Sequence, residues 1–254
     1  MAEGQLLSSV TNAARLLKQF SNKDRELGVS ELSRRLELGK STVHRLVTTL
    51  TAEHLLSQDP ETGKYRLGLA MYDLGSAVAS HLDLHEAVIV PMERLRNLTK
   101  ETVQVSVLDG RDVVYVERLD SPNTLRLFLE VGRRNAAHST STGKVLLAYL
   151  PEHELNQVLD GWILEPKTDA TIVRRDLLVR QLKGIRSRGY AKNLNESETG
   201  VLSVAAPIRD RSGRVVAAMS VAGPDSRMEP AMTEMTQGVI EAAAMASRRL
   251  GYRR

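Results

Sequence analysis

The chain has 254 residues, a formal net charge of +4 and no cysteine. This length predicts two domains, and the lack of cysteine excludes disulfides and cysteine-based metal or redox chemistry. The chain starts without the long apolar run of a signal peptide or membrane span, which predicts a cytoplasmic protein with no membrane partner.

Helical spacing of apolar residues predicts a first helix over residues 8–20, followed by a polar loop over 21–27. A second helix begins near Val29, with Ser30 as its expected N-cap. Gly39 is expected to end this helix, because glycine tolerates the backbone conformation of a helix terminus. The short turn there leads into a third helix, which is the order found in helix-turn-helix proteins.

The third helix has an apolar and a polar side. Its apolar stripe comprises Val43, Leu46, Val47 and Leu50. The polar side chains near its start offer donors suited to phosphates and base edges, so we expect DNA contacts from Lys40, Ser41, Thr42, His44 and Arg45. Arg45 is the best candidate for a base contact and Lys40 for a phosphate contact.

A short hairpin is predicted after the third helix. Residues 54–57 and 64–67 flank the turn 59–63, in which Pro60 fixes the backbone and Gly63 can take a positive φ. Lys64 and Arg66 on this wing are expected to reach DNA phosphates. The alternative for the second and third helices is an α-helical hairpin used only for packing, with the basic residues on a solvated face.

The modest charge of this segment bears on stoichiometry. Residues 1–66 hold ten Lys or Arg against eight Asp or Glu. Because DNA affinity rises with the number of phosphate contacts, one copy should bind weakly. We therefore expect a homodimer or homotetramer that reads paired half-sites of double-stranded operator DNA, about 34 Å apart.

The rest of the chain predicts a linker and an α+β domain. Residues 67–80 read as a linker helix that could also pair with its copy, and the alternative is an ordinary buried helix of the first domain. Further helices are predicted over 85–98, 142–150, 152–159, 173–188 and 230–250. Strands are predicted over 102–108, 112–118, 124–131, 190–193, 200–209 and 215–222. Antiparallel strands flanked by helices indicate the α+β class.

Several motifs in a fixed order resemble the IclR family of bacterial transcriptional regulators. They include KSTVHRL at 40–46, DPETGKYRLG at 59–68, STGKVLLAYLP at 141–151 and GVLSVAAPI at 200–208. The resemblance implies a winged helix-turn-helix at 1–66, a linker helix at 67–80 and a GAF-like effector-binding and oligomerisation domain at 81–254. It also implies a ligand-responsive regulator, most often a repressor, of genes for small-molecule catabolism.

The resemblance implies an effector pocket formed by Ser141, Thr142, Asn193, Val201, Ser203, Ser220 and Ala222. Physical arguments agree, because backbone N–H groups at the start of a helix near Ser141 favour a carboxylate or another anion. Strand alternation also puts Val201 with Ser203, and Ser220 with Ala222, on common faces. A serine in such a place can equally cap the backbone or pack as a small residue.

This chain departs from the family pattern at two places. Asn193 and Asn195 stand where relatives often have an acidic residue, while Glu196 and Glu198 could point elsewhere. Asn135 and His138 lie in a segment that is commonly apolar in the family. An amide and an imidazole there suggest an effector with hydrogen-bonding groups beyond a simple carboxylate.

The sequence also contains a pattern that is typical of an enzyme. Ser141 and Lys144 have the S-x-x-K spacing of a serine acyl-transferase, but the partner motifs S-D-N and K-T-G are missing. The rival function is a small-molecule sensor or hydrolase whose N-terminal domain serves only assembly. We expect no enzyme, and no catalytic residue, cofactor or metal site; the expected partners are operator DNA, a small-molecule effector and further copies of the chain.

Overall fold

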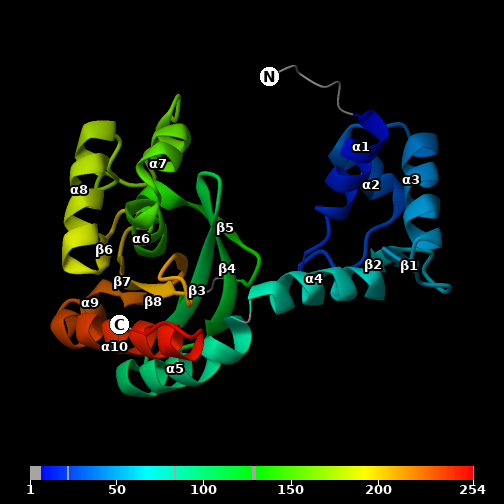
Figure 1. Ribbon diagram of the computed structural model, residues 1–254. Coiled ribbons are helices and arrows are strands. Elements are labelled where there is room, and N and C mark those ends of the chain that lie inside the picture. Colours follow the sequence, from blue (N-terminus) through cyan, green and yellow to red (C-terminus); the bar gives the residue numbers. More distant parts are fainter. Residues whose placement is uncertain (1–6, 22, 83, 128–129, 254) are drawn as a thin grey trace. The chain divides into compact units, whose positions relative to one another are not determined.

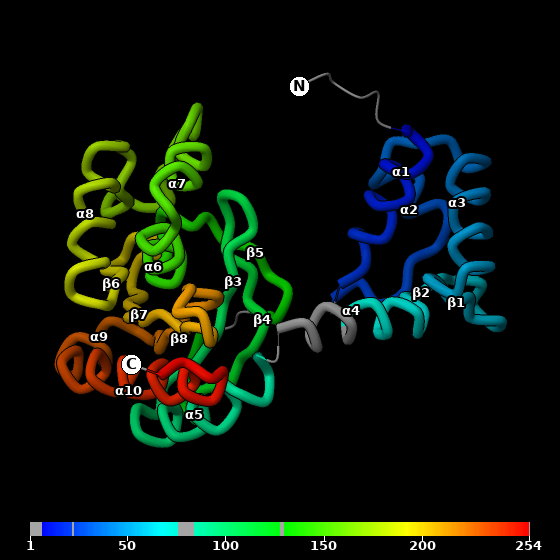
Figure 2. Tube along the Cα trace, viewed as in Figure 1, coloured from blue at the N-terminus to red at the C-terminus, as the bar shows by residue number. Residues whose placement is uncertain are grey.

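The computed structural model describes residues 7–21, 23–82, 84–127 and 130–253, and side chains throughout these except at 76–82. The chain divides into two compact units, Met1–Leu82 and Asp83–Arg254 (Figures 1 and 2). Among these described residues, no helix combines the length and apolar character that crossing a membrane requires.

The first unit is a winged helix-turn-helix, as predicted. Its elements are α1 (Ser8–Leu17), α2 (Val29–Leu36), α3 (Lys40–Ala52), β1 (Leu56–Gln58), β2 (Tyr65–Leu67) and α4 (Leu69–Leu82). The apolar stripes of the first three helices meet in one core, in which Leu16, Leu32 and Val47 are fully buried. This core fixes α3 so that its opposite side faces outward.

The turn between α2 and α3 differs from the prediction. Glu37, not Gly39, takes the left-handed conformation that ends α2, with φ of 57°. The turn is closed by Leu38, whose N–H donates to the Ser33 carbonyl and whose carbonyl accepts from the Ser33 hydroxyl. Gly39 instead precedes α3 as its N-cap, with φ of −58°. Ser30 lies inside α2, after Gly28 at the N-cap position.

The predicted wing is present. β1 and β2 pair antiparallel with Leu56 opposite Leu67. The connecting turn is held by Asp59, whose carboxylate accepts hydrogen bonds from the backbone of Glu61 and Thr62. Gly63 has φ of 67°, which glycine adopts without strain.

The helix α4 follows the wing directly. Along its first part the side chains of Leu69, Tyr72 and Leu74 are exposed in the single chain. An ordinary buried helix would cover such side chains, so this part of α4 does not fit the alternative reading of residues 67–80.

The second unit is built on a six-stranded antiparallel sheet with the order β5-β4-β3-β8-β7-β6. Its strands are β3 (Thr102–Asp109), β4 (Asp112–Leu119), β5 (Arg134–Ala136), β6 (Ala191–Leu194), β7 (Val201–Arg209) and β8 (Val215–Pro224). Its helices are α5 (Leu84–Thr99), the short 3₁₀ turn η1 (Ala137–Ser139), α6 (Ser141–Tyr149), α7 (Glu152–Leu159), α8 (Arg175–Arg188), α9 (Asp225–Met228) and α10 (Met232–Arg249).

Helices cover the two faces of this sheet. α5 and α10 pack together on one face, while α6 and α8 lie on the other (Figure 1). Val145 of α6 and Leu182 of α8 belong to a core cluster with Ala205 and Ala218 of the sheet. The α+β class is thereby confirmed, with the start of α6 held against the middle of the sheet.

The strand predicted over 124–131 is wrong for the part of it that the structure describes. The carbonyls of Leu125 and Leu127 accept hydrogen bonds from the side chains of Arg227 and Arg118 instead of joining a strand ladder. The edge of the sheet is formed by the three residues of β5, where Asp112 pairs with Ala136.

Candidate DNA-binding and effector sites

The polar side of α3 is exposed as predicted. Lys40, Ser41, Thr42, His44 and Arg45 are all exposed, whereas Val43 and Val47 between them are fully buried. On the wing, Lys64 and Arg66 are exposed as well. The seven side chains expected to contact DNA therefore all lie on the surface of the first unit.

The basic side chains of α3 and the wing differ from those of α2 in whether they form ion pairs within the protein. Arg34 and Arg35 of α2 form ion pairs with Glu31 at 2.6 and 2.7 Å. Within the described part of the chain, Arg45 and Lys64 form no ion pair within 4 Å. A charge without a protein partner is available to a phosphate or a base, so these positions suit nucleic-acid contact better than α2 does.

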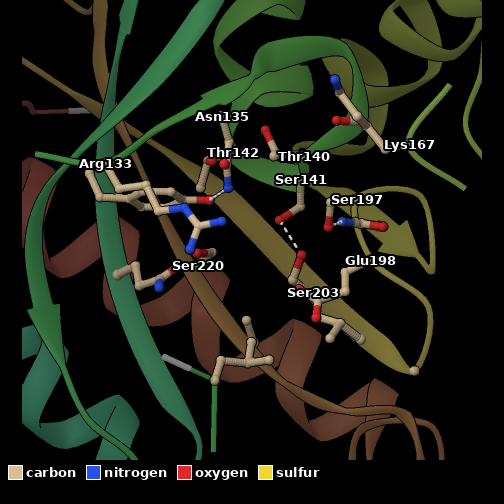
Figure 3. Close-up of a pocket in the computed structure, with 18 of the residues that line it drawn as sticks. Arg133, Asn135, Thr140, Ser141, Thr142, Lys167, Ser197, Glu198, Ser203 and Ser220 are labelled. Atoms are coloured by element: carbon tan, nitrogen blue, oxygen red, sulfur yellow. Dashed lines mark hydrogen bonds between the residues drawn. The ribbon is translucent and has the colours of Figure 1, made fainter. Parts of the chain in front are cut away.

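The second unit contains a cavity of about 790 Å³ between the sheet and the start of α6. All seven residues expected to bind the effector line it: Ser141, Thr142, Asn193, Val201, Ser203, Ser220 and Ala222. Figure 3 shows the hydroxyl groups of Ser141 and Ser203 pointing toward each other and joined by a hydrogen bond of 2.7 Å. Their contact with a ligand stays a prediction.

The register of the sheet brings these residues together from distant segments. Ser203 of β7 lies opposite Ala222 of β8 and Asn193 of β6, so the three share one face. Asn193 also organises the loop that follows it, because its side chain donates to the Ser197 hydroxyl and accepts from the Glu196 backbone N–H, each at 2.7 Å. This loop carries Ser197 and Glu198 to the cavity wall.

The start of α6 faces the same cavity. Thr140 is its N-cap, and the Thr140 hydroxyl accepts from the Gly143 N–H at 3.1 Å. The first N–H groups of a helix lack partners within the helix and lie at the positive end of its dipole. Ser141 and Thr142 therefore present both hydroxyl and backbone donors to the cavity, which suits a carboxylate or another anion.

Lys144 belongs to the wall behind the cavity. Its ammonium group is fully buried, donates to the Lys192 carbonyl at 2.7 Å and forms an ion pair with the carboxylate of Glu196. Burial lowers the pKa of Lys144 and raises the pKa of Glu196, and in each case the charge of the partner opposes the shift. The pair ties α6 to the loop after β6, and Ser141 has Ser203, not Lys144, as its hydrogen-bond partner.

His138 does not line the cavity, although its imidazole was expected near the ligand. Its Nε2–H donates to the Glu165 carbonyl at 2.9 Å, and its ring packs edge-on to Trp162. Nδ1 is buried without a hydrogen-bond partner among the described residues. The imidazole is therefore buried against Trp162 and the Glu165 backbone instead of facing the cavity. Asn135, the amide of that expectation, does line the cavity.

Acid should destabilise the second unit through His138. Burial lowers the pKa of His138 below its ordinary value of 6.5. His138 therefore binds a proton more readily in the unfolded chain than in the folded one. Its contribution to the free energy of unfolding is fully present above pH 6.5 and is lost as the pH falls through its lowered pKa in the folded protein. Urea titrations between pH 8 and 5 should show this loss, and His138→Gln should reduce it. His153→Gln, on the exposed surface of α7, is the control, and an equal slope in the parent and His138→Gln would contradict the assignment.

The cavity also contains residues that the sequence reasoning missed, among them Gln104, Tyr115 and Arg133. A signal for Gln104 was present: in TVQVSV the polar residues Thr102, Gln104 and Ser106 alternate with valines, and these three are buried together with Val103 and Val105. A strand that is buried on both faces and polar on one indicates a hydrophilic cavity. No comparable signal pointed to Arg133.

Two family models together match most of the chain. The model described as "IclR helix-turn-helix domain" matches residues 9–60, and the one described as "Bacterial transcriptional regulator IclR C-terminal" matches residues 76–248. The first match includes α3, and the second includes every residue that lines the cavity.

Similar proteins agree with these models. The HTH-type transcriptional regulator KdgR of Escherichia coli is 34% identical over 99% of this chain and 98% of its own length. The HTH-type transcriptional repressor AllR of the same organism is 33% identical over 79% of this chain and 74% of its own length. The crystal structure of an IclR homologue from Microbacterium hydrocarbonoxydans, complexed with 4-hydroxybenzoate, covers 96% of this chain and 99% of its own, with a TM-score of 0.85 and 27% identity.

Proposed function

The chain belongs to the IclR family of bacterial transcriptional regulators, and from this we propose that it is a cytoplasmic, ligand-responsive repressor of a small-molecule catabolic operon. It binds operator DNA as a dimer or tetramer, and a small organic acid or related metabolite changes its affinity. The observation that carries the proposal is the combination, in one chain, of an exposed polar helix α3 with a separate unit that holds a polar cavity. The similarity to a relative named as a repressor supports repression.

We propose that residues 1–66 bind DNA and that residues 81–254 bind the effector and form the oligomer. The linker helix at 67–80 couples effector binding in the second part to the arrangement of the DNA-binding parts. An effector can change DNA affinity only if it binds one arrangement of the paired DNA-binding units better than another. The exposed apolar side chains of α4, among them Leu69 and Tyr72, support a role for this helix in that pairing.

Arg45 should determine operator specificity. Arg45→Ala is expected to reduce discrimination between operator and random DNA by about 1–3 kcal/mol, because it removes a bidentate contact to one base. Effector affinity should stay nearly unchanged, since Arg45 lies in the other unit. Gel shifts with the promoter region beside the protein's own gene, at fixed salt, measure the effect.

Lys64→Ala is the matched comparison, because Lys64 is assigned to a phosphate. It should weaken binding to all sequences alike and lower the salt dependence by about one counterion. An equal loss of Arg45→Ala on operator and random DNA would contradict the base contact. No operator shift by the parent protein would favour the rival function, a sensor or hydrolase whose N-terminal domain serves assembly.

A further inference from the structure

The floor of the cavity contains polar atoms that the protein leaves unpaired. Gln104 of β3 lies directly opposite Ser220 of β8, so both side chains point from the same face of the sheet. Gln104 and Thr142 are each 2% exposed, and neither Gln104 Nε2 nor Thr142 Oγ1 has a hydrogen-bond partner among the described residues. An unsatisfied buried donor or acceptor destabilises the protein, and a ligand with matching groups removes this cost.

The most deeply buried part of the lining is mostly hydrophilic. Apart from Ala222, every buried side chain that lines the cavity carries a hydroxyl or an amide. A hydrocarbon chain or a bare aromatic ring would leave Gln104 Nε2 and Thr142 Oγ1 unpaired, whereas a ligand with hydroxyl groups would pair them. The cavity volume of about 790 Å³ is within the usual range for small-molecule sites and accommodates an acid of six carbons.

The mouth of the cavity adds a positive charge. Arg134 forms ion pairs with Asp109 and Asp112 on the outer edge of the sheet. Its neighbour Arg133 has no carboxylate within 4 Å in the described part of the chain, and its guanidinium group extends into the cavity toward Ser220 (Figure 3). A guanidinium group in such a place matches the geometry of a carboxylate.

We propose that Gln104, Ser220 and Thr142 form a subsite that recognises a hydroxyl group, and that Arg133 binds a carboxylate near the mouth. The effector is then an aliphatic hydroxy acid rather than a hydrocarbon or aromatic acid. This inference rests on the proposed function, because it assigns the ligand of the same cavity.

Calorimetric titration of the full-length protein with matched acids tests the ligand class. The pairs are glycerate with propanoate and gluconate with hexanoate, together with 4-hydroxybenzoate and the neutral polyol sorbitol. At least one hydroxy acid should bind 10-fold or more tightly than its partner without hydroxyls, and sorbitol should bind more weakly than gluconate. Equal binding within both pairs, tighter binding of 4-hydroxybenzoate, or no binding of either hydroxy acid would overturn the proposal.

Variants assign the roles. Gln104→Met, nearly isosteric, should reduce the preference for the hydroxy acid at least fivefold, and Ser220→Ala tests the same subsite independently should Gln104→Met fail to fold. Arg133→Met should weaken both members of a pair about 10-fold and leave their ratio unchanged. Gln181→Met, outside the cavity on α8, is the control for the glutamine change. An unchanged ratio in both subsite variants would remove the assignment.

A gel shift with the same acids separates this inference from the proposed function. If only hexanoate or 4-hydroxybenzoate changes operator binding, the regulator stands and the hydroxy-acid assignment fails. If the parent protein does not shift the operator, or no acid changes the shift, the proposed function itself is contradicted. A response to gluconate or glycerate that Gln104→Met weakens supports both.

Discussion

Replacing Lys144 with methionine should lower the free energy of unfolding by about 3–5 kcal/mol at neutral pH. The substitution leaves the carboxylate of Glu196 buried without its ion-pair partner, and it removes the donor to the Lys192 carbonyl. The loss is large because a buried charge is far more costly alone than in a pair. Urea unfolding followed by circular dichroism measures it.

The effect should depend on pH in a defined direction. Burial already raises the pKa of Glu196 in the folded protein above its ordinary 4.5, and loss of the Lys144 charge removes the interaction that opposes the shift. A group with a raised folded pKa gives stability that is present at low pH and lost as the pH rises through that pKa. The Lys144→Met defect should therefore be smaller at pH 5 than at pH 8.

Two further variants distinguish the ion pair from simple packing. Lys144→Met/Glu196→Leu should recover most of the lost stability, because an apolar pair leaves no buried charge. Val145→Ala, in the buried stretch of the same helix, should destabilise by loss of packing without this pH dependence. A double variant as unstable as Lys144→Met, or a loss of stability that does not change with pH, would show that Lys144 and Glu196 stabilise the fold only by packing.

Local patterns predicted the exposed side of α3 and the wing because the determinants of both are local. The stripe of Val43, Val47 and Leu50 repeats with the period of a helix and fixes which residues of α3 face outward. The wing depends on a five-residue turn in which Asp59 and Gly63 have well-known preferences. Neither requires knowledge of distant contacts.

The cavity could be predicted only in part, because its walls meet through tertiary contacts. Lys144 and Glu196 are 52 residues apart, and nothing in either segment alone specifies the pair. Gln104 meets Ser220 only because β3 and β8 are neighbours in the sheet. The residues implied by family resemblance line the cavity, and so does Gln104, which the alternation of polar residues and valines in β3 indicates.

At residues 124–131 the error is the opposite one, because a local pattern predicted a strand that the described residues of this segment do not form. Alternating leucines predicted a strand, but the Leu125 carbonyl accepts a hydrogen bond from Arg227, which lies 102 residues further along the chain. Side-chain donors can satisfy a backbone as well as a neighbouring strand does. Sequence periodicity indicates which residues favour burial. It does not indicate whether a neighbouring strand or a side chain forms the hydrogen bonds to the backbone.

Gly143→Ala should cost about 3 kcal/mol of stability, at the upper end of ordinary overpacking, and should abolish the effector response. A Cβ on Gly143 would lie 2.7 Å from the carbonyl carbon of Ala137 and closer still to the Ala137 Cα and carbonyl oxygen. These are backbone atoms, which cannot rotate away as a flexible side chain can. The start of α6 must therefore move and take Ser141 and Thr142 out of their positions in the cavity wall.

Gly184→Ala provides the matched control in the same unit. Gly184 lies within α8, and a Cβ there would meet only the end of the Arg188 side chain, at 3.7 Å. Alanine favours a helix interior over glycine, so this variant should gain up to about 1 kcal/mol. Chemical unfolding and titration with the strongest-binding acid measure both variants. Because α6 is held to η1 by backbone contact, a Gly143→Ala protein with stability within about 1 kcal/mol of the parent and an intact response would mean that the cavity does not depend on this close approach.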